Sequence, residues 1–290
     1  MIFVSGASGT VGRAVLDEVS KSGRPVRAMY RRAEEASKAP AGVSTVIADF
    51  ASKDSLRKGL EGVDILFLVC SPIPALVELE TNAIEASKES GVQHVVLNSA
   101  LGAEDYPKSF PGWRRAVEDK LKSSGLAYTI LRPNSFMQNI VAYMAPSIRS
   151  QGAFYAAMDS AKTSYLDVRD IAAVTARVLG SPAEHAGQTY ELNGPEAVTY
   201  AELADRISRV IGRPVSFVDI PEVAQRKSML DLGMPEWQVD ALLDLQRYYT
   251  GGKGGEVTDV LPRLLGRAPI KLDQFLEEFK AEFAGQTANA

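Results

Sequence analysis

The sequence predicts an α/β fold in which a doubly wound parallel sheet is followed by a smaller, mostly helical C-terminal lobe. Three observations predict it. Short apolar runs alternate with segments of helical periodicity through the first half of the chain. Glycines follow the helical segments at Gly23, Gly62, Gly91 and Gly125, where helices commonly end in a left-handed turn. After Pro133 this regular alternation stops.

The elements of the first half follow from these runs. Apolar and β-branched residues predict strands at 2–4, 26–30, 43–47, 65–69, 94–98 and 127–131. Helical periodicity predicts helices at 10–22, 53–60, 76–90 and 113–123. Strands that recur with a helix between them form right-handed crossover units, so helices should cover both faces of the sheet.

The second half is less regular. It predicts helices at 167–179, 200–211, 238–249 and 272–283, and short strands at 189–193 and 215–220. We therefore expect a sheet domain over residues 1–133. Residues 134–290 should form a smaller lobe that covers the substrate and the carboxyl ends of the strands, with some segments rejoining the sheet.

Composition excludes several classes of protein. The 290 residues are 46% hydrophobic and 23% charged, which is typical of a globular protein, and the net charge of −4 argues against nucleic acid or an anionic membrane as partner. One cysteine, Cys70, cannot form an intrachain disulfide, and with only His94 and His185 beside it a metal site is not expected. Neither a signal peptide nor an apolar span is visible, so a cytoplasmic location is expected; the sequence is compatible with a homo-oligomer.

A glycine-rich turn follows the first predicted strand and opens the first helix. It reads GASGTVG over residues 6–12. Gly6 permits a tight turn, Gly9 lets the backbone approach a pyrophosphate, and Gly12 lets the helix pack closely on the sheet. The anion would bind free amides at the positive end of the helix. This context predicts a Rossmann-type NAD(P)-binding domain; a glycine turn without a ligand is the alternative. The expected contacts are Gly6, Ser8, Gly9, Thr10, Val11 and Gly12.

The end of the second strand predicts which dinucleotide is bound. NAD-specific domains place an acidic residue here, whereas this chain has Arg31 and Arg32. Guanidinium groups suit a 2′-phosphate, so NADPH should be preferred, with NADH binding more weakly. A solvated basic pair is the alternative. Beside the adenine, Asp49 could accept a hydrogen bond and Phe50 could pack, unless they only cap and anchor the next helix.

The Tyr-Lys pair of short-chain dehydrogenases, spaced i and i+4 on a helix, is absent where it would be expected. Of the ten tyrosines only Tyr249 has a lysine four residues later, Lys253, and Gly251 and Gly252 between them disfavour a helix. Chemistry that needs a phenolate base is therefore disfavoured.

Several motifs together resemble the NmrA-like family of atypical short-chain dehydrogenases. They are the glycine turn, Arg31, NSA at 98–100, LRPNSFMQN at 131–139, YLDVRDIA at 165–172 and GEVTD at 255–259. The family includes NADPH-dependent quinone reductases, triphenylmethane-dye reductases, flavin-free azo reductases and catalytically silent NADP sensors. The resemblance implies dinucleotide binding by Gly6, Gly9, Thr10, Val11, Arg31 and Asp49, with Ser71 near the ribose.

The same resemblance implies that Ser99 and residues 133–139 line the nicotinamide and substrate side. Reductase-like members often carry a histidine four residues before the glutamate matched by Glu118. This chain has Arg114 there. The departure points to a different substrate or to an absence of turnover.

Hydride transfer to a conjugated acceptor needs mainly positioning, because a quinone or dye delocalises the arriving charge. Ser99 or Asn134 could hydrogen-bond the acceptor oxygen. Arg114 could stabilise negative charge or bind an anionic substituent, unless it is a solvated surface residue, and Tyr106 could donate a proton. A flat acceptor also suits an apolar, aromatic pocket. The expected lining is Phe110, Trp113, Asn134, Phe136, Met137, Ile140 and Tyr143, of which Phe136, Ile140 and Tyr143 are spaced along one helix face unless they are simply core.

Two functions from different classes follow. The first is an NADPH-dependent oxidoreductase that passes hydride directly, without flavin or metal, to a small aromatic or quinonoid substrate such as a quinone or azo dye. The second is a catalytically silent NADP(H) sensor. An epimerase or dehydratase is disfavoured by the absent Tyr-Lys pair.

Overall fold

The computed structural model describes residues 1–104 and 109–284, and the chain divides into two compact units. The first unit comprises Met1–Pro133 and Val168–Glu191, and the second comprises Asn134–Asp167 and Leu192–Ala290. Each unit has its own hydrophobic core and is described by itself.

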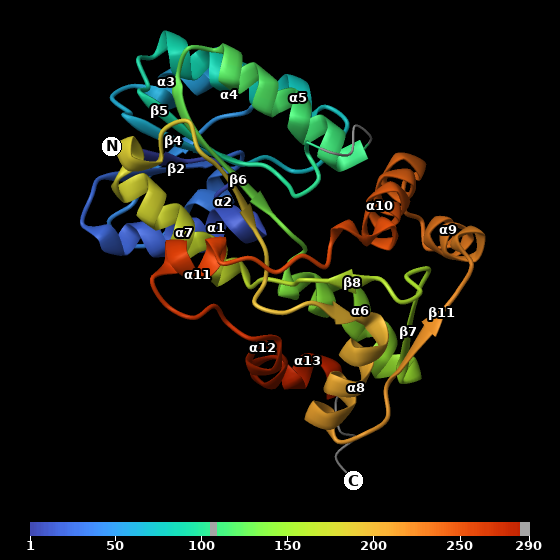
Figure 1. Cartoon of the computed structure of the whole chain (residues 1–290). Helices are drawn as coiled ribbons and strands as arrows, with labels where there is room; N and C mark the ends of the chain where they lie inside the picture. The colour runs from blue at the N-terminus through green and yellow to red at the C-terminus, as the bar shows by residue number, and fades with distance from the viewer. Residues whose placement is uncertain (105–108, 285–290) are drawn as a thin grey trace. The chain divides into compact units, whose positions relative to one another are not determined.

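A seven-stranded sheet forms the centre of the first unit, in the order β3-β2-β1-β4-β5-β6-β9 (Figure 1). The first six strands of this order pair in parallel. The order reverses between β1 and β4, which is the topological switch point where doubly wound sheets bind their ligands. The predicted fold class is confirmed. The strands are β1 (Ile2–Val4), β2 (Val26–Tyr30), β3 (Ser44–Ile47), β4 (Ile65–Leu68), β5 (His94–Asn98), β6 (Ala127–Pro133) and β9 (Thr189–Leu192).

Helices cover both faces of this sheet. Helices α3, α4 and α5 pack side by side on one face, and α1 packs against α7 on the other (Figure 1). Alternate strand residues point to opposite faces, and Phe3, Leu66 and Leu97 enter the core beneath α3, α4 and α5. The helices are α1 (Thr10–Val19), α2 (Ala33–Ala36), α3 (Lys53–Leu60), α4 (Leu76–Glu89), α5 (Ser109–Ser123) and α7 (Val168–Gly180), with the short 3₁₀ turns η1 (Ser20–Ser22) and η2 (Pro182–His185).

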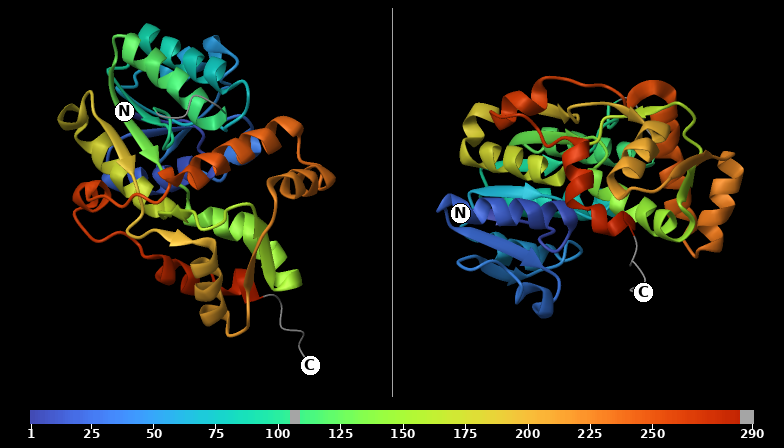
Figure 2. Two further views of the ribbon diagram at one scale, coloured as in Figure 1. Left: turned by 45° about the vertical axis from the view of Figure 1, so that its right-hand side comes forward. Right: turned by 90° about the horizontal axis from the view of Figure 1, so that it is seen from below.

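The second unit is built from helices and two small sheets. β7 pairs with β11 in parallel and β10 pairs with β8 antiparallel, while α8 packs beside β11 (Figure 2). Its strands are β7 (Ala153–Ala156), β8 (Lys162–Thr163), β10 (Val198–Thr199) and β11 (Ser216–Asp219). Its helices are α6 (Met137–Gln151), α8 (Tyr200–Ile211), α9 (Glu222–Asp231), α10 (Glu236–Tyr248), the π-helical turn η3 (Tyr249–Lys253), α11 (Val260–Leu265), α12 (Leu272–Glu278) and α13 (Lys280–Ala284).

The second unit also departs most from the sequence-based expectation. The predicted helix at 272–283 is two helices, α12 and α13, because the backbone leaves helical geometry at Phe279. Helix α6 was expected only through the helical spacing of Phe136, Ile140 and Tyr143; it extends to Gln151 and contains Pro146, although proline normally interrupts a helix. The core of this unit contains Phe154, Phe275 and Phe283.

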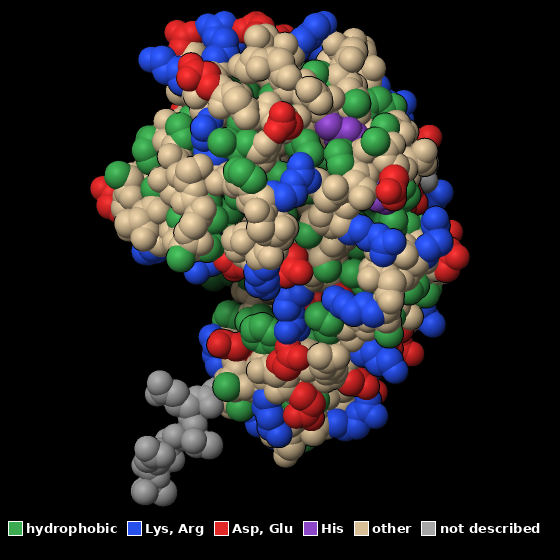
Figure 3. All heavy atoms as spheres, turned by 90° about the vertical axis from the view of Figure 1, so that its left-hand side faces the viewer, with side chains coloured by type: hydrophobic (Ala, Val, Ile, Leu, Met, Phe, Trp, Pro, Cys, Tyr) green, Lys and Arg blue, Asp and Glu red, His purple; other side chains and the backbone are tan. Residues whose placement is uncertain are grey.

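On the face shown in Figure 3, lysine and arginine side chains are interspersed with aspartate and glutamate. None of the helices in the described ranges is both long and apolar enough to cross a bilayer. Among those same residues there is no cluster of histidine, cysteine and carboxylate side chains that could hold a metal ion.

Candidate functional site

The glycine turn lies at the switch point of the sheet, between β1 and α1. Gly6 has a left-handed φ of 56°, and a Cβ there would lie 2.7 Å from the carbonyl oxygen of Val69. A Cβ on Gly12 would lie 2.1 Å from the carbonyl oxygen of Gly6. Both distances are too short for any side chain, so the close approach of α1 to the sheet requires glycine at both positions.

The N-terminus of α1 is open for an anion. Gly9 is the N-cap residue with extended backbone, and no described side chain caps the helix. The first turn carries no acidic residue, and Ser8, Gly9 and Thr10 are exposed. The amides of this turn and the helix dipole therefore favour a phosphate here. The side chain of Val11 is 7% exposed, so of this residue only the backbone amide is placed to meet a phosphate.

The two arginines after β2 have different surroundings. Arg31 is exposed and forms no ion pair with any residue the structure describes. Arg32 forms an ion pair with Glu35 in α2. Of the two predicted 2′-phosphate ligands, Arg31 therefore has its guanidinium available, whereas Arg32 already neutralises a carboxylate.

Of the residues expected beside the adenine and the ribose, one is buried and two are exposed. Phe50 is 8% exposed and packs in the hydrophobic core of the first unit, which is the alternative to packing beside the adenine. Asp49 is exposed, and its Oδ1 accepts a hydrogen bond from the amide of Ala51 at 2.9 Å, while Ser52 caps α3. Asp49 thus retains a carboxylate oxygen toward solvent. Ser71 is exposed after β4, next to the switch point.

Arg114 is not a solvated surface residue, which corrects that alternative, and its guanidinium has partners within the protein. It is 5% exposed, and one of its terminal nitrogens donates to both oxygens of Glu80, at 2.8 and 3.0 Å. The other donates to the carbonyl of Cys70 at 3.1 Å. Burial raises the pKa of Glu80, and Arg114 opposes that rise. The buried pair therefore holds the backbone at the end of β4 in place.

The thiol of Cys70 does not act as a nucleophile in this arrangement. Burial, followed by the neighbouring charge of Glu80, raises the pKa of the thiol to about 11. At neutral pH the sulfur is protonated and behaves as a small apolar group.

Ser99 also has a different partner from the one expected. Its hydroxyl donates to Oε1 of Glu118 at 2.6 Å, and the residue is 3% exposed. Glu118 in turn accepts from Nε and a terminal nitrogen of Arg132, at 2.9 and 2.7 Å. Burial works against the charge of Arg132, yet hydrogen bonds to Glu118 and Glu104 raise its pKa. Because its proton is taken by Glu118, the hydroxyl of Ser99 can serve a ligand only as an acceptor.

Three residues at the start of the second unit that were expected to bind the acceptor are buried in the structure. Asn134 is buried, with its amide donating to Ser164 Oγ at 2.8 Å and its oxygen accepting from Tyr249. Met137 and Ile140 have no exposed surface and lie in the core of this unit. Their predicted roles in binding an acceptor do not fit these positions.

Phe136, Ile140 and Tyr143, which were expected along one helix face, differ in exposure. Phe136 precedes α6 as its N-cap residue, and Tyr143 is 65% exposed although Ile140 is buried. Phe136 and Tyr143 remain accessible. In the first unit, Phe110 and Trp113 pack edge to face with ring centroids 5.3 Å apart at the start of α5. Tyr106 lies outside the described residues.

The single Tyr-Lys match in the sequence does not form a catalytic pair. Tyr249 and Lys253 fall in the π-helical turn η3, in which Gly252 has a left-handed φ of 83°. The hydroxyl of Tyr249 donates to Asn134 at 3.1 Å, and burial raises its pKa. Catalysis by a phenolate would need the pKa to be lowered.

Glu80, Glu118 and Arg132 were missed as parts of the site. Their signal was present in the sequence, because each places a charge where an apolar residue would be expected. Glu80 lies in the buried stripe of α4 with Leu76 and Ile84, and Glu118 lies beside Val117 in α5. Charged residues in such stripes are buried only when they are paired.

Comparison with known proteins gives a consistent result. The model of the NmrA-like family matches residues 1–273. An NAD(P)H azoreductase of Xenophilus azovorans is 34% identical over 98% of this chain and 99% of its own. A (4-alkanoyl-5-oxo-2,5-dihydrofuran-3-yl)methyl phosphate reductase of Streptomyces griseus subsp. griseus is also 34% identical, over 98% and 99%. The crystal structure of NADPH-dependent quinone oxidoreductase QOR2 from Escherichia coli complexed with NADPH aligns with a TM-score of 0.90 at 28% identity, over 97% of this chain and 100% of that one.

Proposed function

This chain belongs to the NmrA-like family, and from that premise we propose that it binds NADPH in preference to NADH and transfers hydride directly, without flavin, to a quinone, azo dye or similar conjugated acceptor. The chain is an NAD(P)H-dependent oxidoreductase, as its relatives indicate: two are named reductases and each matches 98% of this chain, and the quinone oxidoreductase structure matches 97% of it. The preference for NADPH, the direct transfer and the acceptor are the parts proposed here.

One observation carries the proposal, namely the open helix N-terminus at the switch point. Gly6 and Gly12 bring α1 against the sheet, with no room for a Cβ on either residue. The uncapped first turn of α1 is then free to bind the pyrophosphate, and Arg31 at the end of β2 is free to bind a 2′-phosphate. The first turn of α1 and Arg31 therefore suit the two phosphate-bearing parts of NADPH.

The chain's own groups contribute positioning more than acid–base catalysis. The Arg114–Glu80 pair fixes the backbone at Cys70, and Glu118 fixes Ser99 at the end of β5. NADPH, when bound, supplies two electrons and one proton as hydride. Reduction of a quinone to the quinol then needs one further proton, and water can provide it because the quinol has a phenol-like pKa of about 10. No side-chain proton donor is required.

The test is turnover by protein shown by its absorption spectrum to be free of flavin. NADPH oxidation is followed with menadione and with methyl red, using NADPH deuterated at either face of C4. The proposal expects turnover and a primary isotope effect with one of the two deuterated forms. Turnover that appears only on adding FMN would refute direct transfer.

A second function, the catalytically silent NADP(H) sensor, is favoured by one observation. Ser99, Arg114 and Asn134, which were the candidate groups for the acceptor, all have partners within the protein. Tight binding of NADP⁺ and NADPH with different affinities, and no turnover of any acceptor, would favour the sensor.

A further inference from the structure

The buried face of α5 carries a guanidinium and a carboxylate one helical turn apart, at Arg114 and Glu118. Arg114 pairs with Glu80 of α4, and Glu118 pairs with Arg132 of β6. None of these four side chains is more than 7% exposed. Together Glu80, Arg114, Glu118 and Arg132 are called the charged collar below.

The charged collar contacts the chain at the carboxyl ends of three neighbouring strands. Arg114 donates to the carbonyl of Cys70 at 3.1 Å, two residues after the end of β4. Glu118 accepts from the hydroxyl of Ser99 at 2.6 Å, directly after β5, and its partner Arg132 lies near the end of β6. These three strands are adjacent in the sheet. The collar therefore holds the chain where the ladders of β4 and β5 have stopped.

Stability alone does not explain why four charges are buried here. Moving charges out of water carries a desolvation cost that their mutual attraction often fails to exceed, and apolar side chains of similar volume can replace such a pair without loss of stability. Burial raises the pKa of Glu80, while Arg114 and a backbone hydrogen bond from Cys70 lower it. What a buried pair can supply beyond stability is a single, specified arrangement of the chain. In this protein the chain so arranged lies at Cys70 and Ser99.

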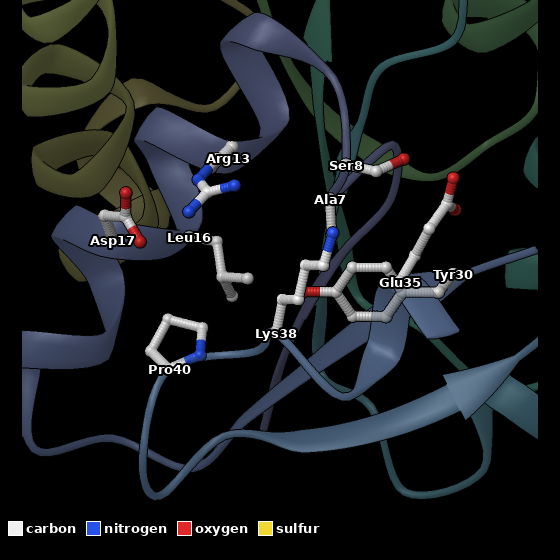
Figure 4. A pocket seen from close by; sticks show the side chains of 9 residues that line it. All are labelled: Ala7, Ser8, Arg13, Leu16, Asp17, Tyr30, Glu35, Lys38 and Pro40. Carbon is white, nitrogen blue, oxygen red and sulfur yellow. The ribbon is translucent and has the colours of Figure 1, made fainter. Parts of the chain in front are cut away.

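A pocket lies on the other side of the switch point, toward β2. Ala7 and Ser8 of the glycine turn, Arg13 of α1 and Tyr30 of β2 are among its lining side chains (Figure 4). In doubly wound folds this side of the sheet takes the adenosine half of a dinucleotide, and the strands beyond the switch point take the other half. The described residues that line the pocket include no member of the charged collar. The collar thus belongs to the half of the sheet formed by β4, β5 and β6.

We propose that the charged collar positions the part of the chain that binds the nicotinamide half of the dinucleotide. Arg114 and Glu80 act through Cys70, and Glu118 acts through Ser99. This inference rests on the proposed function. The residue after Cys70 is exposed, so a shift of the Cys70 backbone reaches a group that a ligand can contact. Loss of the collar should therefore weaken only those ligands that have a nicotinamide half.

The experiment is calorimetric titration of the full-length protein with NADPH and with 2′,5′-ADP, which lacks the nicotinamide half. The variant is Glu80→Met with Arg114→Met, which removes both charges of one pair and leaves neither buried without its partner. It should bind NADPH about 3- to 10-fold more weakly, as expected for the loss of about one hydrogen bond to the ligand, and should bind 2′,5′-ADP as the wild type does.

The matched control is Arg115→Met with Asp119→Met. These residues form an ion pair on the same helix, but their side chains are 41% and 57% exposed. An exposed pair of this kind contributes little to stability, so the control should change neither affinity.

A second variant, Arg114→Lys, retains a positive charge beside Glu80. An ammonium lacks the planar fork by which the guanidinium reaches both the carboxylate and the carbonyl of Cys70. Arg114→Lys should therefore show the same selective loss of NADPH affinity. It decides the question if far-ultraviolet circular dichroism shows that the double variant is not folded.

The outcomes distinguish this inference from the proposed function. If the wild-type chain binds neither NADPH nor 2′,5′-ADP, the proposed function fails. If it binds both, and the folded collar variants keep the wild-type ratio of the two affinities or lose both affinities equally, only the positioning role of the collar is overturned. None of these measurements needs turnover.

Discussion

Replacing Arg114 by methionine should destabilise the first unit, because the buried carboxylate of Glu80 would lose its ion-pair partner. The glutamate has no exposed surface, and Arg114 supplies it with two hydrogen bonds, at 2.8 and 3.0 Å. Removing one partner of a buried ion pair costs about 3–5 kcal/mol, because the other charge stays buried without compensation. At about 2 °C per kcal/mol for a chain of this size, the melting temperature should fall by about 6–10 °C.

The double variant Glu80→Met with Arg114→Met separates this cause from a general loss of packing. Two apolar side chains of suitable volume can replace a buried pair at little cost, so the double variant should be more stable than either single one. Urea unfolding followed by tryptophan fluorescence in a Trp237→Phe background reports on the first unit, because Trp113 is then the remaining tryptophan. If the losses of the two single variants simply add, the two residues are not coupled and the reasoning is wrong.

The pH dependence gives a second check on the same pair. Burial raises the pKa of Glu80 in the folded state, so its ionisation opposes folding as pH rises through that pKa. Without Arg114 the pKa should rise further. The deficit of Arg114→Met should therefore shrink as the pH is lowered toward the unfolded-state value of about 4.3. A deficit that stays constant from pH 8 to pH 5 would contradict this account.

Three further predictions concern the glycine turn, the 2′-phosphate and a buried histidine. Gly12→Ala should abolish NADPH binding in calorimetry, because its Cβ would meet the carbonyl of Gly6, whereas Gly180→Ala, with no atom within 4 Å, should bind normally. Arg31→Ala should raise KM for NADPH by about tenfold and leave KM for NADH nearly unchanged, since one charge-assisted bond to phosphate contributes about 1.5 kcal/mol; equal effects on both would remove the assignment. Burial lowers the pKa of His94, so stability should fall as pH drops below about 6.5, and His94→Gln should flatten that slope in urea titrations; an unchanged slope would exclude His94 as its source.

The sequence was sufficient for the sheet and its glycine turn because these depend on local signals. The strand predicted at 65–69 is a continuous apolar run, and Gly6 and Gly12 stand directly between a strand and a helix, where the structure leaves no room for a Cβ. The predicted bounds of helix 53–60 agree with α3 because Ser52 caps it and glycine follows at Gly62.

The candidate site was less predictable because side-chain partners come from distant parts of the chain. Arg114 pairs with Glu80 34 positions away, and Asn134 contacts Gly254 at a separation of 120. Helical spacing likewise could not show that Tyr143 is exposed while Ile140 is buried, since that depends on which strands and helices pack against α6. Pairing between buried charges is a tertiary property, and local pattern shows only that a charge stands in an apolar stripe.

The most direct test of the account is a calorimetric titration of the wild-type protein with NADPH and then with NADH. Binding of one NADPH per chain, tighter than NADH, with the difference between them lost in Arg31→Ala, is the result predicted. No detectable binding of either dinucleotide, by a protein shown to be folded, would contradict the assignment of the glycine turn and everything that rests on it.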